Sequence, residues 1–179
     1  MWGTVKAIKR DHSVSPIVIM GVSGCGKTTV GRALAERLDA TFIDADDFHP
    51  AANVEKMRAG TPLNDEDRTP WLATLNRELR ERSLGGERVV LACSALKLRY
   101  REAITAQLAH VDWIFLEGSF EVIAQRVRAR ANHYLPESLL RSQFEALERP
   151  ENATCISIEL NAAEQVEAAL SSLAIEPLN

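Results

Sequence analysis

Residues 21–28 read GVSGCGKT and match the spacing GxxxxGK[ST] at every fixed position. Glycines let successive backbone N–H groups turn inward around a phosphate chain. A lysine at this spacing reaches the outer phosphates, and a Ser or Thr hydroxyl completes the shell of a Mg²⁺ ion. The loop therefore predicts a nucleoside-triphosphate site. Its expected contact residues are Gly21, Val22, Ser23, Gly24, Cys25, Gly26, Lys27, Thr28 and Thr29.

The segments on either side of the loop favour this interpretation over a chance match. The apolar run 17–20 precedes it and is typical of a short buried strand. Residues 27–38 follow, with Val30, Leu34 and Leu38 on one face of a predicted helix. A strand, a glycine loop and a helix in this order are the context in which the motif binds phosphate, because the helix N-terminus adds its dipole to the anion site.

A group of acidic residues, Asp44, Asp46 and Asp47, follows the second predicted strand, together with His49. Such a group can simply cap a helix. Facing a phosphate loop, however, one carboxylate can hold Mg²⁺ through its waters and another can accept a proton from an attacking hydroxyl. The third predicted strand ends without an aspartate, so the second must supply these groups. We expect Asp46 to be the base and Asp44 to assist the metal with Thr28.

A second polar group begins at residue 65. Asp65, Glu66 and Asp67 are explained by the acidic start of a helix. Arg68 admits two interpretations that the spacing does not separate. It pairs with the preceding acids, or its guanidinium binds a substrate carboxylate through two parallel hydrogen bonds.

Arginines recur at positions 126, 128 and 130, and Arg126 and Arg130 lie on one face of a predicted helix. They form an exposed basic face, or they neutralise charge on a phosphoryl group during transfer. For a phosphoryl-transfer enzyme we expect the second role, in a lid spanning about 126–137, with Arg130 catalytic and Arg126 contacting the nucleotide.

The elements that must position these residues alternate along the chain. This order predicts an α/β three-layer sandwich, in which helices flank a five-stranded parallel sheet. We expect one domain over 16–179, preceded by a tail at 1–15. The predicted strands are 17–20, 41–44, 88–93, 112–117 and 154–158, and the predicted helices are 27–38, 51–59, 69–84, 95–110, 120–131, 137–147 and 162–173.

Composition narrows the classes of partner. A net charge of −4 over 179 residues provides no excess of basic residues for nucleic acid. No stretch of about 18 apolar residues predicts a membrane span, and no secretory signal precedes the domain. The three cysteines are an odd number without metal-ligand spacing. We expect a cytoplasmic protein with reduced thiols, in which Cys25 fills a small-residue position or is open to oxidation.

An ordered series of motifs closely resembles the gluconate kinase family, whose small enzymes are nucleoside-monophosphate-kinase-like and related in fold to shikimate kinase. The series spans about residues 16–160. It departs from the family pattern at two positions, where Ala45 and Cys25 replace other small residues. Its motifs are GVSGCGKT, DADDFHP, KM, PLNDEDRTPWL, CSALK, YR and LLRSQFEALERP.

The resemblance implies a homodimeric kinase that transfers phosphate from ATP, with Mg²⁺, to the 6-hydroxyl of D-gluconate. It implies that Arg68 binds the gluconate carboxylate, with His49 and Lys97 nearby, and that Asp46 receives the hydroxyl proton. His133 and Gln143 match the family pattern, but the residues alone assign them no role. The alternatives are a shikimate-kinase-like enzyme, disfavoured by CSALK where that family has a glycine run, and a non-catalytic nucleotide switch, which needs no base.

Overall fold

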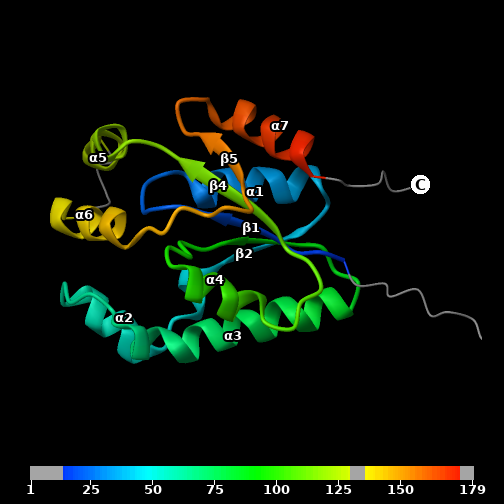
Figure 1. Ribbon diagram of the computed structural model, residues 1–179, viewed down its shortest axis with the longest axis horizontal. Coiled ribbons are helices and arrows are strands. Elements are labelled where there is room, and N and C mark those ends of the chain that lie inside the picture. The colour runs from blue at the N-terminus through cyan, green and yellow to red at the C-terminus, as the bar shows by residue number, and fades with distance from the viewer. Residues whose placement is uncertain (1–13, 130–135, 174–179) are drawn as a thin grey trace, which may run out of the picture.

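In a computed structural model, which describes residues 14–129 and 136–173, five strands form one parallel sheet (Figure 1). Their spatial order is β2-β3-β1-β4-β5. Every pairing is parallel, so the carboxyl ends of all five strands meet at one edge. The strands are β1 (Ile17–Met20), β2 (Thr41–Asp44), β3 (Val89–Ala92), β4 (Asp112–Glu117) and β5 (Thr154–Ser157).

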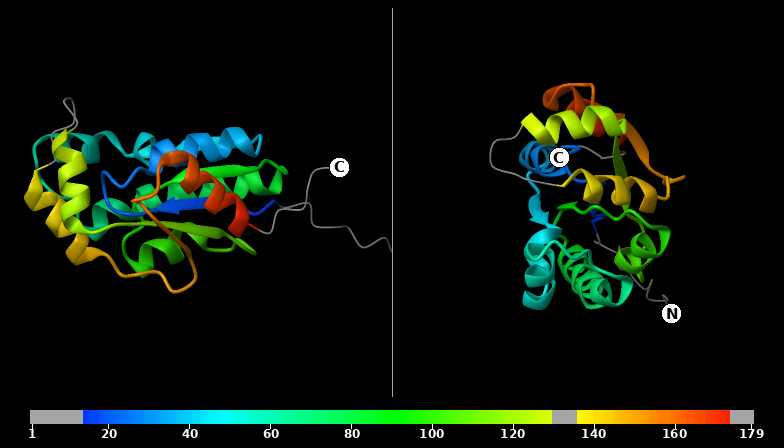
Figure 2. Two further views of the ribbon diagram at one scale, coloured as in Figure 1. Left: turned by 90° about the horizontal axis from the view of Figure 1, so that it is seen from above. Right: turned by 90° about the vertical axis from the view of Figure 1, so that its left-hand side faces the viewer.

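Helices cover both faces of the sheet and complete a three-layer sandwich (Figures 1 and 2). One hydrophobic cluster joins the sheet to α1, α5, α6 and α7, and a second joins it to α3 and α4. The predicted fold class is therefore confirmed. The helices are α1 (Lys27–Arg37), the 3-10 helix η1 (Ala45–Phe48), α2 (Ala51–Arg58), α3 (Asp65–Leu84), α4 (Leu98–Thr105), α5 (Phe120–Ala129), α6 (Glu137–Ala146) and α7 (Ala162–Ser172).

The central strand β1 shows how the sequence specifies these layers. Successive side chains of a strand point to opposite faces of the sheet. Ile17 and Ile19 accordingly enter one hydrophobic cluster, while Val18 and Met20 enter the other. All four are at most 2% exposed. Each such side chain contributes about 1.5–3 kcal/mol on burial, which fixes the register of the strand that leads into the phosphate loop.

Helix α3 begins at Asp65, four residues before the start predicted from Pro70. The reason is a capping box: the Asn64 side chain accepts a hydrogen bond from the Asp67 N–H, and the Asp67 carboxylate accepts one from the Asn64 N–H, both at 2.8 Å. Pro70 consequently lies in the second turn rather than the first. The assignment of the acidic residues to the helix start is correct, since Asp65, Glu66 and Asp67 all lie in the first turn.

Helix α4 is shorter than the predicted segment 95–110, because residues before Leu98 form a loop. Ala95 has a φ of 46°, and the buried Arg101 guanidinium donates to the carbonyls of Ala95 and Leu96, each at 3.1 Å. At the other end the helix stops at Thr105, and Gln107 has a φ of 64°. The chain therefore turns before the helix begins, which leaves Ser94 at the wall of the cavity at the end of β3.

Two predicted regions fall largely outside the described residues. The tail at 1–15 lies outside them except for Val14 and Ser15, and the central part of the predicted lid, 130–135, lies outside them with Arg130 and His133. Across the described ranges, no helix combines the length and apolar character that a membrane span requires.

Candidate active site

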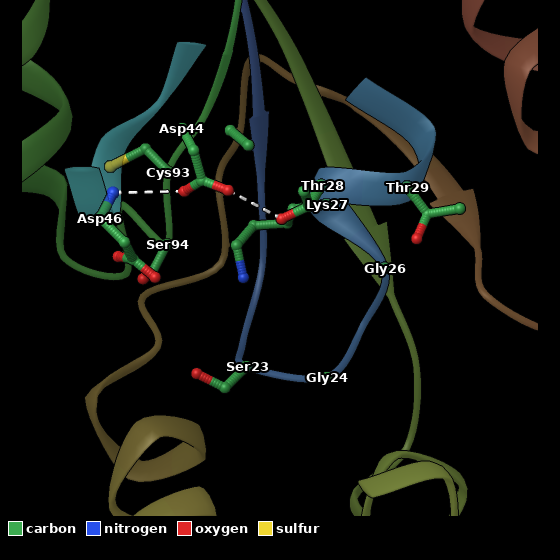
Figure 3. Close-up of a pocket in the computed structure, with 11 residues that line it drawn as sticks. Ser23, Gly24, Gly26, Lys27, Thr28, Thr29, Asp44, Asp46, Cys93 and Ser94 are labelled. Carbon is green, nitrogen blue, oxygen red and sulfur yellow. Dashed lines mark hydrogen bonds between the residues drawn. The ribbon is translucent and has the colours of Figure 1, made fainter. Parts of the chain in front are cut away.

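A cavity opens at the carboxyl ends of β1, β2 and β3, where the phosphate loop meets the second and third strands (Figure 3). The Gly21 N–H donates to the Ser94 carbonyl at 3.4 Å and joins the loop to the end of β3. The phosphate loop and the acidic group after the second strand, both predicted from the sequence, meet at this cavity, whereas no role was predicted for Ser94. The cavity is lined by Ser23, Gly24, Gly26, Lys27, Thr28, Thr29, Asp44, Asp46, Ala92, Cys93 and Ser94.

The backbone of the loop has the form that a phosphate cradle needs. Gly24 and Gly26 have φ values of 85° and 109°, which side chains with a Cβ rarely allow. Gly26 caps α1, so the N–H groups of the first helical turn face the cavity. The Lys27 ammonium donates to the Val22 carbonyl at 3.0 Å and lies across the loop. These features fit a bound polyphosphate.

Cys25 is fully buried beneath the loop. Its sulfur would lie 2.8 Å from a Cβ placed on Gly21, so the thiol fills the space between the loop and β1. This position agrees with the interpretation of Cys25 as a small packing residue and leaves the thiol no access to solvent.

Thr28 and Asp44 meet as the metal prediction requires. The Thr28 hydroxyl donates to Asp44 Oδ2 at 3.0 Å, and Asp44 Oδ1 accepts from the Asp46 N–H at 3.2 Å (Figure 3). The second contact caps η1 and fixes the Asp44 carboxylate toward the loop. Within the described ranges, no group of three His, Cys, Asp or Glu side chains converges as a metal site. One hydroxyl and one carboxylate nevertheless fit Mg²⁺, which is commonly held by few protein ligands together with phosphates and water.

Asp46 lines the same cavity, and its side chain is 83% exposed. The carboxylate is thus open to a substrate hydroxyl entering beside the phosphate loop. The neighbouring Asp47 is also exposed but does not line the cavity. The structure therefore separates two aspartates that the sequence presents as a pair.

His49 is packed rather than open. Its side chain is 4% exposed, and its ring stacks on Trp71 with centroids 4.3 Å apart and planes 15° apart. Nε2 lies 3.9 Å from Asp46 Oδ1, and buried Nδ1 has no hydrogen-bond partner among the described residues. Burial lowers the pKa of His49 below its usual 6.5, more than Asp46 raises it, and Arg68 lowers it further. His49 is thus a neutral imidazole at pH 7.

The lowered pKa of His49 predicts a pH-dependent stability. The unfolded chain binds a proton near pH 6.5 and the folded chain does so only at lower pH, so the free energy of unfolding falls as the pH drops below 6.5. One proton contributes at most about 1.4 kcal/mol per pH unit. Urea unfolding at pH 7.5 and 5.5 should show a smaller loss for His49→Gln than for the wild type. Equal losses in both proteins would contradict this.

Arg68 and Lys97 lie together around the Tyr100 ring. The Arg68 guanidinium carbon and the Lys97 ammonium are each 5.5 Å from the ring centroid. Arg68 Nη2 donates to the Leu63 carbonyl at 3.2 Å, while its buried Nε has no partner among the described residues. Arg68 therefore forms no ion pair with the acids before it, although Nη2 is engaged by a backbone carbonyl, and its binding of a substrate carboxylate stays a prediction.

Asp65 is the centre of a charged group that the sequence analysis assigned to the helix start alone. Tyr100 donates its hydroxyl proton to the Asp65 carboxylate, Lys97 Nζ donates at 3.3 Å, and Arg99 lies at 2.6 Å. The Tyr100 hydrogen bond, followed by those cations, holds the pKa of Asp65 below its usual range. Arg99 was not predicted, and the only signal for it is its spacing from Lys97 and Tyr100.

Cys93 follows β3 and lines the cavity together with Lys27 and Asp46. Burial raises the pKa of this thiol to about 12, and a hydrogen bond with the Ala95 backbone lowers it by less. Cys93 is thus a protonated, buried thiol at the wall of the cavity, and Arg68 does not line this cavity.

Arg126 lies apart from the loop cavity. Its guanidinium donates to the carbonyl of Ile158, just beyond β5, instead of facing the residues that line the cavity. Arg126 would therefore contact the nucleotide only if part of the nucleotide extends from the loop toward β5. Arg130, its predicted catalytic neighbour, is outside the described residues.

Comparisons with known proteins agree with this geometry. A protein-family model described as shikimate kinase matches residues 23–172. The chain is 48% identical to the thermosensitive gluconokinase of Escherichia coli, over 75% of this chain and 72% of that protein. It is 46% identical to a gluconokinase of Arabidopsis thaliana, over 80% and 82%.

Solved structures give the same result at the level of the fold. A gluconokinase from Sinorhizobium meliloti matches with a TM-score of 0.80 and 42% identity, over 88% of this chain and 90% of that one. Shikimate kinase from Acinetobacter baumannii matches with a TM-score of 0.57 and 22% identity, over 89% and 93%, which extends the likeness of fold only. With a matching family model, sequence identities well above 40% and a kinase-type phosphate loop, the chain belongs to the gluconokinase family.

Proposed function

We propose that this protein transfers the terminal phosphoryl group of ATP to the 6-hydroxyl of D-gluconate, giving 6-phospho-D-gluconate and ADP. The observation that carries this proposal is that an exposed carboxylate, Asp46, lines the same cavity as the phosphate loop. A nucleotide-binding switch needs no base there. Membership of the gluconokinase family supports the choice of acceptor.

The donor half is formed by the loop and the second strand. Lys27 and the backbone N–H groups of the loop bind the phosphates, and Thr28 with Asp44 would hold Mg²⁺. The ion supplies positive charge that stabilises the transferring phosphoryl group. Lys27 has a weak neutral partner, the Val22 carbonyl, which it can exchange for a phosphate oxygen at little cost.

The acceptor half is formed by Asp46 and the residues around Tyr100. Asp46 orients the substrate hydroxyl and accepts its proton as the oxygen attacks phosphorus and the bond to ADP breaks. Arg68 binds the gluconate carboxylate, since its guanidinium forms no ion pair with an acid in the described part of the chain and contacts the same Tyr100 ring as Lys97. The neutral His49 lies close to Asp46, with Nε2 3.9 Å from Asp46 Oδ1.

Replacing Arg68 by alanine should raise the KM for gluconate about tenfold to a hundredfold, because a carboxylate loses a bidentate partner, while the KM for ATP stays close to wild type. Steady-state kinetics in both substrates measure this. Arg77→Ala is the matched control, since Arg77 is exposed on the same helix. An unchanged KM for gluconate would remove Arg68 from the binding site.

A panel of acceptors tests the substrate. ADP release should be fastest with D-gluconate when the wild-type protein is assayed against D-gluconate, related sugar acids and shikimate at equal concentrations. A preference for shikimate would favour the alternative, which the relatives do not support.

Two further expectations follow from the family resemblance. We expect a homodimer, for which light scattering should give twice the 19.8 kDa of one chain. We expect a cytoplasmic location without nucleic-acid or membrane partners, which fractionation of cells that produce the protein would test.

A further inference from the structure

Two consecutive helices, α5 and α6, contact the phosphate loop at Ser23 and Gly24, although they lie about 100 residues further along the chain. From α5, Val127 packs against Gly24 so closely that a Cβ placed there would lie 2.5 Å from its Cγ2. From α6, Gln143 makes two hydrogen bonds to Ser23. Figure 3 shows Ser23 at this tip, on the side of the cavity that faces these helices. The Gln143 contact is thus part of the wall of the site.

The orientation of the Gln143 carboxamide follows from its partners. The Ser23 backbone N–H can only donate, so the atom 2.7 Å from it is the carbonyl oxygen Oε1. The amide nitrogen Nε2 must then face the Ser23 hydroxyl, at 3.0 Å. Nε2 can only donate, so Ser23 Oγ is the acceptor in this contact.

This polarity has a consequence for Ser23. Since Oγ accepts from Gln143, its own proton must point elsewhere. Among the described residues no protein group accepts that proton, and Ser23 lines the cavity together with Lys27 and Thr28. The Ser23 hydroxyl can therefore donate a hydrogen bond to an anion bound in the phosphate-loop cavity.

The Gln143–Ser23 hydrogen bonds are not explained by a need to hold helix α6 against the domain. Leu140 is 1% exposed in the main hydrophobic cluster, and Phe144 packs edge-on against Phe120 with centroids 5.5 Å apart. These apolar contacts hold the helix in place. The Gln143 hydrogen bonds instead reach a loop whose polar groups carry the chemistry.

We propose that Gln143 is a positioning residue that presents the Ser23 hydroxyl as a hydrogen-bond donor to the terminal phosphoryl group of the nucleotide. The proposal rests on the nucleotide half of the function proposed above and is independent of the acceptor. It makes Ser23 a side-chain contact that distinguishes a triphosphate from a diphosphate.

The substitution Gln143→Glu tests this polarity with little change in shape. A glutamate still accepts from the Ser23 N–H, but its second oxygen also accepts, so it takes the hydroxyl proton away from the nucleotide. Calorimetric titration without an acceptor should show Mg-ATP binding weakened about tenfold, the size of one hydrogen bond to a charged oxygen. Mg-ADP binding should change less than about threefold.

Gln143→Glu adds a negative charge as well as turning the Ser23 hydroxyl away from the nucleotide. A double-mutant cycle separates these two effects on ATP binding. In a Ser23→Ala background, Gln143→Glu should change ATP binding by less than about threefold, because no hydroxyl remains to be turned. Ser142→Glu places the same charge on the exposed neighbour and should leave ATP binding near wild type. An equally large effect in the Ser23→Ala background would overturn the proposal.

A second variant keeps the test informative if Gln143→Glu does not fold, which thermal unfolding would reveal. Ser23→Ala alone should weaken ATP about tenfold while leaving ADP within about threefold. An unchanged ratio of ATP to ADP affinity would also overturn the proposal. Because no acceptor is present, failure of the wild type to phosphorylate gluconate would leave these results unaffected.

Discussion

Lys27→Ala should lower kcat/KM for ATP by on the order of a hundredfold or more, equivalent to about 3 kcal/mol or more of lost transition-state stabilisation. Lys27 carries the positive charge of the phosphate loop, on the wall of the cavity beside Thr28. Its protein partner is a neutral carbonyl, Val22, so the charge is free to interact with the phosphoryl group in transfer. Initial-rate kinetics with gluconate and Mg-ATP measure the loss.

The fold should tolerate this change, because the ammonium makes a single hydrogen bond, to an uncharged carbonyl in a partly exposed loop, which contributes about 1–2 kcal/mol. Thermal unfolding of the variant should therefore stay near that of the wild type. Lys27→Arg keeps the charge with a bulkier head group and should retain more activity than the alanine variant. If Lys27→Ala keeps its activity within about threefold, the lysine does not stabilise the transition state.

Asp46→Asn should lower kcat by about a hundredfold to ten-thousandfold, the range in which a positioned base contributes. Asparagine keeps the size of the side chain but cannot accept the hydroxyl proton. Because the backbone N–H that caps η1 belongs to residue 46 itself, its contact with Asp44 is retained. Calorimetry should show ATP binding close to wild type, and rapid-quench kinetics should show a slow chemical step.

Asp47→Asn is the matched control for this substitution. Asp47 is also exposed on the same short helix but does not line the cavity, so its variant should keep nearly full activity. If both variants lost activity equally, the effect would belong to the charge of the cluster rather than to Asp46. Near-normal turnover of Asp46→Asn would eliminate it as the base.

The parts of this site that the sequence predicted are local in character. The phosphate loop is defined within eight consecutive residues, and the Asp44 contact with Thr28 joins the end of β2 to the helix that follows β1, at the edge of the sheet where all the parallel strands end. The predicted start of α3 is four residues too late, because that prediction places Pro70 in the first turn of the helix. The capping box of Asn64 and Asp67 determines the start instead, and its two residues, three positions apart, are visible in the sequence.

The parts that the sequence did not predict depend on tertiary packing. Gln143 and Ser23 are 120 residues apart, and no periodicity or spacing links them. Asp65 has the composition of a helix start, yet Tyr100 and Lys97 reach it from another helix and its preceding loop. The exposure of Asp46 relative to the buried His49 likewise depends on how η1 sits against Trp71.

In the proposed enzyme, one edge of the sheet carries the groups for both substrates. The loop after β1 and Asp44 at the end of β2 form the proposed donor side, while the segment after β3 supplies Ser94 and Lys97. Asp46 lines the same cavity as the loop. The order of the strands, with β3 between β2 and β1, brings the three together.

Identification of the product tests the central claim most directly. The wild-type protein is incubated with Mg-ATP and D-gluconate, and the product is examined by phosphorus–proton correlation NMR. We expect one new phosphate ester whose phosphorus couples to the two protons on carbon 6, formed together with an equal amount of ADP. A phosphate on another carbon, or ADP without a phosphorylated sugar acid, would contradict the account.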